Sequence, residues 1–98
     1  MFLYKVISEK NWQESQNAKI LLLDPMDKEF IHLAMESQLD RIISKFWGEG
    51  PKYIVLKLDV NLLQGNLVLE ANPGGTHQYY HLYDGSIPLK SVLELVWV

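Results

Sequence analysis

The sequence predicts one α+β domain over residues 1–98, with a small, mostly antiparallel, split sheet of about five to six strands and two helices. Three observations predict this class. A chain of 98 residues has room for one hydrophobic core but not for a second. Apolar residues make up 48% of the chain and charged residues 21%, as in ordinary globular proteins. Segments with strand-like alternation also outnumber those with helical spacing.

The first strand and the first helix follow from the N-terminal residues. Residues 2–7 are mostly apolar and aromatic over the length of a strand. Ser8 is a helix-capping residue, and it precedes a short helix predicted over residues 9–17. Trp12 lies within this helix and would anchor it to the sheet.

The second predicted helix is the clearest one in the chain. A loop with a short extended stretch covers residues 19–29, where Asp24-Pro25 marks a turn, and residues 30–33 form a second strand. Gly48–Pro51 ends the helix that follows. Its apolar residues recur at helical spacing: Met35, Leu39, Ile42, Ile43 and Phe46.

The second half of the chain contains strands and turns. Residues 52–59 alternate strictly, so that Ile54, Leu56 and Leu58 face one way, and the opposite face, which includes Val55, is the wetter one. A single turn follows this strand. Further strands are predicted over residues 66–71, 79–83 and 92–98, with turn signals at residues 72–75, 84–85 and 88.

Composition and charge exclude several classes of function. Nine Lys and Arg oppose twelve Asp and Glu, which gives a net charge of -3, and no segment combines clustered basic residues with aromatic ones, so no nucleic-acid partner is expected. The chain has no cysteine, which excludes disulfides and fits a reducing compartment. Because no run resembles a signal peptide or a membrane span, we expect a cytoplasmic protein without a membrane partner.

A histidine within an apolar run is the strongest functional signal in the sequence. His32 lies between Ile31 and Leu33, so its side chain points to the strand face opposite the one that these two residues bury. On that face it is placed to meet a ligand. The alternative is a partly buried histidine whose ring is satisfied by a backbone carbonyl.

A second histidine shares a strand face with two tyrosines. Tyr79, His81 and Tyr83 alternate along one strand and form a polar, aromatic stripe, which suits stacking on a flat ring. The alternative is a row of strand-favouring residues with no ligand. Glu70 closes a neighbouring strand, where it is either a general base or ribose anchor, or a solvated strand end.

No metal site is expected from the sequence. His77 and His81 are four residues apart, but in a turn and strand their rings would lie roughly 13 Å apart. The pattern also lacks a phosphate-binding loop, because Gly74-Gly75 has neither a following helix nor a following lysine.

Several segments together resemble one bacterial family, called domain of unknown function 952. The resemblance covers nearly the whole chain, and its most specific part is the combination of a Phe-Ile-His-Leu segment with a later His-Leu-Tyr segment. The segments are Leu3-Tyr4-Lys5-Val6, Trp12, Phe30-Ile31-His32-Leu33, Val55-Leu56-Lys57-Leu58-Asp59 with Leu62-Leu63, Glu70, and His81-Leu82-Tyr83 with Pro88-Leu89.

The resemblance implies an ADP-ribosyltransferase-like fold, in which catalytic relatives bind a nicotinamide dinucleotide in a cleft of the split sheet. By position, Lys5 stands where several family members have histidine, and His32 falls where the wider superfamily has its second cleft residue. His81 and Tyr83 match the second family motif. This fold likeness is only a weak guide to function.

The chain departs from the family pattern beside the implied cleft. Ala34 stands where the family commonly has serine, and Tyr80 stands where it usually has proline. The segment Asp84-Gly85-Ser86 replaces a glycine. The resemblance therefore leaves open whether the chain keeps the catalytic activity of the wider superfamily.

Two functions of different classes follow. In the first, the protein binds a nucleotide or NAD-like ligand as cofactor or substrate in a cleft lined by histidine and tyrosine. Lys5, His32 and Tyr83 are its ligand-binding residues, with His32, His81 and Glu70 as the catalytic candidates of an ADP-ribosyltransferase-like transferase.

In the second function, the protein is a non-catalytic interaction module that uses the stripe of Tyr79, His81 and Tyr83. The chain is expected to be a monomer or a homodimer. A homodimer would pair through the apolar strand at residues 92–98, because an exposed apolar edge favours pairing.

Overall fold

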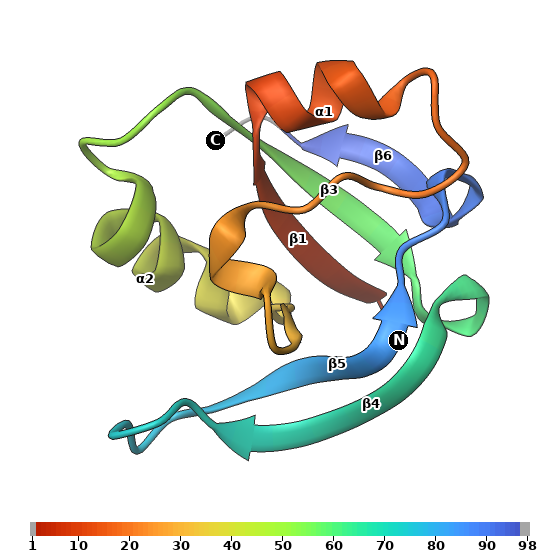
Figure 1. Ribbon diagram of the computed structural model, residues 1–98. Coiled ribbons are helices and arrows are strands. Elements are labelled where there is room, and N and C mark those ends of the chain that lie inside the picture. Colours follow the sequence, from red (N-terminus) through yellow and green to blue (C-terminus); the bar gives the residue numbers. More distant parts are fainter. Residues whose placement is uncertain (1, 97–98) are drawn as a thin grey trace.

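The computed structural model describes residues 2–96, within which six strands form two antiparallel sheets (Figure 1). Each sheet has three strands, in the orders β1-β3-β6 and β2-β5-β4. The predicted α+β class with a split antiparallel sheet is therefore confirmed. The strands are β1 (Phe2–Ser8), β2 (Ile31–His32), β3 (Tyr53–Asp59), β4 (Gln64–Ala71), β5 (Gln78–Ser86) and β6 (Val92–Val96).

The first sheet is covered on both faces, which divides the core into two clusters. On one face of β1, Leu3 and Ile7 belong to the larger cluster, under the second sheet and helix α1 (Glu9–Ser15). On the other face, Tyr4 and Val6 belong to the smaller cluster. Val55 is fully buried in that smaller cluster, so the face of β3 that was predicted to be wetter is partly core, because a helix covers it.

Helix α1 begins where the sequence predicted. Ser8 is its N-cap, and the Ser8 hydroxyl accepts a hydrogen bond from the Asn11 N–H at 3.3 Å. Trp12 packs against the larger cluster, as predicted. The helix ends at Ser15, two residues earlier than the predicted boundary, because the chain turns toward the loop at residues 16–19.

The helix that covers the smaller cluster has three consecutive geometries. It passes from a 3₁₀ turn (Glu36–Gln38) through helix α2 (Leu39–Ile42) to a π-helical segment (Ile43–Trp47). Leu39, Ile43 and Trp47 are buried. A π turn contains more residues than an α turn, so Trp47, four residues after Ile43, points to the core. Phe46, which was predicted to lie on the apolar face, is 52% exposed.

Strands β4 and β5 form a long curved hairpin (Figure 1). Strand β5 continues through Asp84 and Gly85, where the sequence predicted an interruption. A register shift between Gln64 and Asn66 and a positive φ of 50° at Asp84 bend the hairpin without ending it. The backbones approach so closely there that a Cβ atom on Gly85 would lie 1.8 Å from the Gln64 carbonyl oxygen.

Strand β6 lies at the edge of the first sheet. Its outer residues Leu93 and Leu95 are 50% and 37% exposed, so pairing of two chains through this edge stays a prediction. Positions 97 and 98 of the predicted strand lie outside the described residues. No helix among residues 2–96 is both long enough and apolar enough to cross a bilayer.

The close approach at Gly85 leads to a first prediction. Gly85→Ala should destabilise the protein by about 2–4 kcal/mol, because the new methyl group forces two paired backbones apart. The matched control is Gly74→Ala, where φ is +77° and no atom lies within 4 Å of the new Cβ, so only the left-handed conformation costs about 1–2 kcal/mol. Urea unfolding followed by tryptophan fluorescence measures both. A loss at Gly85 no larger than that at Gly74 would contradict the close approach.

Candidate functional site

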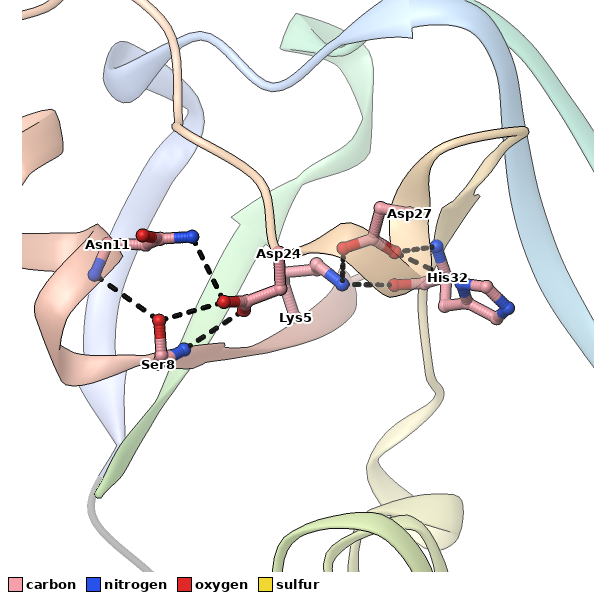
Figure 2. A network of polar contacts seen from close by, with 6 residues as sticks. All are labelled: Lys5, Ser8, Asn11, Asp24, Asp27 and His32. Carbon is pink, nitrogen blue, oxygen red and sulfur yellow. Dashed lines mark hydrogen bonds and ion pairs between the residues drawn. The ribbon is translucent and has the colours of Figure 1, made fainter. Parts of the chain in front are cut away.

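Two aspartates attach the loop before β2 to the first strand (Figure 2). Asp24 accepts hydrogen bonds from the Ser8 N–H at 3.2 Å, from the Ser8 hydroxyl at 2.9 Å and from the Asn11 amide at 3.0 Å. Ser8 thus caps helix α1 and holds the loop at the same time. This attachment places the short 3₁₀ turn Pro25–Asp27 beside β1.

The second aspartate forms a buried ion pair with a lysine of β1. Lys5 stands in the row between Leu3 and Ile7, and its side chain is 2% exposed. Its ammonium group lies 2.9 Å from Asp27 Oδ2 and donates to the His32 carbonyl oxygen at 3.1 Å. The contact with Oδ2 is ionic, since this oxygen accepts no hydrogen bond of normal geometry. A buried charge requires such a partner.

The same carboxylate holds His32. Asp27 Oδ1 lies 2.9 Å from the His32 backbone N–H and 3.0 Å from the ring nitrogen Nδ1. Because an ionised carboxylate only accepts hydrogen bonds, Nδ1 is the donor. Burial acts to raise the pKa of Asp27, but the hydrogen bonds from His32 and the charge of Lys5 outweigh burial and lower this pKa below its ordinary value.

A separate polar cluster lies on the outer face of the second sheet. His81 is fully buried; its Nδ1 lies 2.8 Å from a carboxylate oxygen of Glu70 and its Nε2 lies 2.8 Å from Asn72 Oδ1. The Tyr83 hydroxyl donates to the same Glu70 oxygen. The hydrogen bonds from Tyr83 and His81 lower the pKa of Glu70, and the bond to Glu70 raises the pKa of Tyr83.

The Phe30 ring contacts both polar clusters, the one that contains His32 and the one that contains His81. Its ring stacks on the His81 ring with centroids 4.1 Å apart and lies 4.7 Å from the His32 ring. His32 and His81 are paired in register across β2 and β5, with ring centroids 5.4 Å apart. Because Phe30 covers His81, the stripe of Tyr79, His81 and Tyr83 is not a continuous exposed surface.

A groove of about 460 Å³ opens beside His32, a volume typical of small-molecule sites. The first sheet, the second helix and the turn of the β4–β5 hairpin form its walls. Its charged lining residues are Lys5, Arg41 and Lys45, and the lining contains no carboxylate. The full lining is Tyr4, Lys5, Val6, Met26, His32, Leu33, Ala34, Arg41, Ile42, Lys45, Phe46, Trp47, Asn72, Pro73, Gly74, Gly75, Thr76, His77 and Tyr79.

Side-chain contacts connect the hairpin turn to the second helix across the groove. The Gln38 amide donates to the Gln78 carbonyl oxygen at 2.8 Å. Arg41 Nη1 lies 3.5 Å from His77 Nδ1. Lys45 follows Arg41 by one helical turn, and neither forms an ion pair with any carboxylate of residues 2–96. Two cations at this spacing repel each other slightly.

Some of the residues that the sequence singled out line the groove in the structure, and others lie outside it. Lys5 and His32 both line the groove, but the Lys5 ammonium is occupied by Asp27. Glu70, His81 and Tyr83 lie together outside the lining, and Asn72 connects them to it. No group of three or more His, Cys, Asp or Glu side chains that could hold a metal ion occurs among residues 2–96.

Sequence reasoning missed Asp27, Arg41 and Lys45. The sequence did contain a signal for Arg41 and Lys45. Like charges four residues apart on a helix repel each other and slightly lower the stability of the helix. Asp27 had no such signal, since its partners Lys5 and His32 lie on other elements.

Comparison with known proteins gives a family and a fold. A family model described as protein of unknown function (DUF952) matches residues 6–95. Two crystal structures of protein CC0527 from Caulobacter crescentus, one of them a double mutant, each match with a TM-score of 0.82 and 22% identity, over 98% of this chain and 84% of that chain. At this identity the likeness shows the fold alone. No curated protein matches the chain.

The buried ion pair leads to a second prediction. Lys5→Met and Asp27→Asn should each cost about 3–5 kcal/mol of unfolding free energy, because each leaves one buried charge without its partner. The double variant should lose clearly less than the sum of the two single losses. Urea denaturation of the three variants measures this coupling, and additive losses would show that the two charges do not interact.

The lowered pKa of Asp27 leads to a third prediction. Its stabilising effect is complete above the ordinary value of 3.8 and is lost as the pH falls through the lower pKa of the folded state. The stability difference between wild type and Asp27→Asn should therefore shrink below about pH 4. Thermal unfolding between pH 7 and pH 2.5 measures it, with exposed Asp40→Asn as the control. A difference that does not change with pH would contradict an ionised Asp27.

Proposed function

The chain belongs to the DUF952 family of proteins of unknown function, and we propose that its groove binds a nucleotide or NAD-like small molecule through the phosphate groups. One observation carries the proposal. In a protein of net charge -3, this groove is lined by two exposed cations, Arg41 and Lys45, and by Lys5, whose charge is already paired with Asp27, while no carboxylate is among its lining residues. Such a groove attracts anions by its local potential.

The chemistry of the two exposed cations fits phosphate. The Arg41 guanidinium is a planar, multiple donor that suits phosphate oxygens, and the Lys45 ammonium adds a mobile charge one turn away. Lys5 was predicted from the sequence to be a ligand-binding residue. Its ammonium is already paired with Asp27, so the proposal assigns it to the frame of the groove and assigns phosphate binding to Arg41 and Lys45.

Apolar side chains at the mouth of the groove suit the other half of a nucleotide. Met26 and Phe46 both line the groove and are 47% and 52% exposed. A flat base covers such apolar surface, and sulfur and aromatic side chains stack well on rings. A ligand with a phosphate at one end and a ring at the other therefore matches the groove.

The proposal also includes a more specific statement, that the fold is ADP-ribosyltransferase-like and that the protein is a transferase of that type. Its support is the split antiparallel sheet and the groove that contains His32. Tyr83, His81 and Glu70 form a hydrogen-bonded layer behind Asn72, so in this proposal they position Asn72 at the edge of the groove.

Titration with phosphate-containing ligands tests the proposal and is a fourth prediction. ADP-ribose, ADP and pyrophosphate should shift the backbone amide resonances of the groove residues, and adenosine should bind more weakly. Arg41→Gln and Lys45→Gln should each weaken ADP-ribose binding roughly 10- to 100-fold, because each removes a charge-assisted hydrogen bond. Binding should also weaken as salt is added.

Lys90→Gln is the matched control, because Lys90 is an exposed lysine outside the groove. Its affinity for ADP-ribose should equal that of the wild type. Absence of shifts with every phosphate compound, or equal weakening in the control, would contradict the proposal.

A further inference from the structure

The carboxylate of Asp27 determines which nitrogen of the His32 ring faces the groove with a lone pair. Asp27 is buried, and its lowered pKa keeps it ionised at neutral pH. Its Oδ1 accepts from His32 Nδ1 at 3.0 Å, so a neutral His32 ring carries its lone pair on Nε2. Figure 2 shows Nε2 on the side of the ring that points away from Asp27. One ring nitrogen is thus held by Asp27, and the other is free to gain or lose a proton.

The free nitrogen of His32 belongs to the groove. The His32 side chain is 35% exposed and lines the groove, and Nε2 has no hydrogen-bond partner among residues 2–96. A neutral Nε2 only accepts hydrogen bonds, so it cannot bond to an ionised phosphate oxygen, which also only accepts them. A protonated Nε2 donates, and its bond to phosphate is charge-assisted. A ligand phosphate at this nitrogen therefore selects the doubly protonated, imidazolium form of His32.

Ionisable groups reach His32 from several elements. On the turn before β2, Asp27 is the one charged group among residues 2–96 that hydrogen-bonds to the ring. Lys5 of β1 contacts the other oxygen of Asp27 and the His32 carbonyl oxygen, not the ring. From β5, the His81 ring lies 5.4 Å away between centroids. The remaining ionisable groups on this side act on His81 or on one another, and they are Glu29, Glu70 and Tyr83. A protonated His32 ring therefore forms an ion pair with Asp27.

The other ionisable side chains of the groove lining differ from His32. Arginine and lysine keep their charge through the neutral range, so Arg41 and Lys45 attract phosphate without responding to pH. The His77 ring faces Arg41, whose Nη1 lies 3.5 Å from His77 Nδ1, so a protonated His77 would bring two positive charges together. Two tyrosines, Tyr4 and Tyr79, complete the set, and a phenol loses its proton only well above neutral pH.

We propose that His32 binds a ligand phosphate as an imidazolium and thereby couples nucleotide binding to the uptake of a proton. Nδ1 donates to Asp27, and Nε2 donates to a phosphate oxygen. The complex takes up a proton wherever the His32 ring of the free protein is neutral. Because binding and protonation are linked, each favours the other, and the ligand binds more tightly as the pH falls. The inference rests on the proposed function, because a phosphate must first bind in the groove.

Isothermal titration calorimetry of the wild-type protein with ADP-ribose, between about pH 5.5 and pH 8.5, tests the coupling. The diphosphate of ADP-ribose stays fully ionised in this range, so any proton taken up belongs to the protein. Titrations in two buffers of different ionisation enthalpy give the number of protons taken up. We expect uptake that approaches one proton, and an affinity that falls by up to about tenfold per pH unit as the pH rises. Binding without proton uptake at every pH would overturn this inference and leave the proposed function intact, whereas absence of binding would overturn both.

Two variants then assign the proton to a residue. His32→Gln should still bind ADP-ribose, because the new amide donates a hydrogen bond without titrating, and its affinity should no longer depend on pH. His77→Gln is the matched control, and it should keep the pH dependence of the wild type whatever its affinity. A pH dependence that persists in His32→Gln, or that disappears in His77→Gln, would overturn the assignment to His32.

Nitrogen NMR of the His32 ring tests the same inference without any variant. Just above the pH at which the ring of the free protein loses its proton, the ¹⁵N shifts should show the remaining proton on Nδ1, as the contact with Asp27 requires. Saturation with ADP-ribose at the same pH should move Nε2 to the shift of a protonated nitrogen. An Nε2 that stays unprotonated in the complex would overturn the inference even if His32→Gln fails to fold.

Discussion

The ion pair between Lys5 and Asp27 is the interaction on which the rest of the molecule depends. An ammonium group within a row of core residues is costly unless a charge of opposite sign meets it there. The chain supplies that charge from a loop and not from a neighbouring strand, so the loop must return to the face of β1. The hydrogen bonds of Asp24 to Ser8 and Asn11 fix the same return from its other end.

The position of His32 is a consequence of this arrangement. Asp27 has one oxygen toward Lys5 and the other toward His32, and the latter accepts from both the backbone and the ring. A single carboxylate thereby fixes a strand end, a ring orientation and a tautomer. The ion pair contributes to the site mainly by this precision, because a buried ion pair by itself is a weak source of stability.

The two walls of the groove differ in how they are held. The wall at β1 and β2 rests on buried, charged contacts. The opposite wall, formed by the hairpin turn and the second helix, is joined through Gln38 with Gln78 and through Arg41 with His77, and these contacts are exposed. Exposed hydrogen bonds open more readily than buried ones. The groove therefore combines a side held by buried contacts, which contains His32, with a side whose exposed contacts open more readily.

The sequence by itself determined the local elements and the kind of residue that matters. Alternation in β3, the capping Ser8 and the turn at residues 72–75 are local signals, and His32 was conspicuous because an apolar run surrounds it. Only the tertiary structure decided that Lys5 meets Asp27, that Val55 is core, that Arg41 faces His77, and that His81 belongs to a layer behind the groove. The physical reason is that periodicity records which face of an element a residue occupies, whereas these pairings depend on which elements the fold brings together.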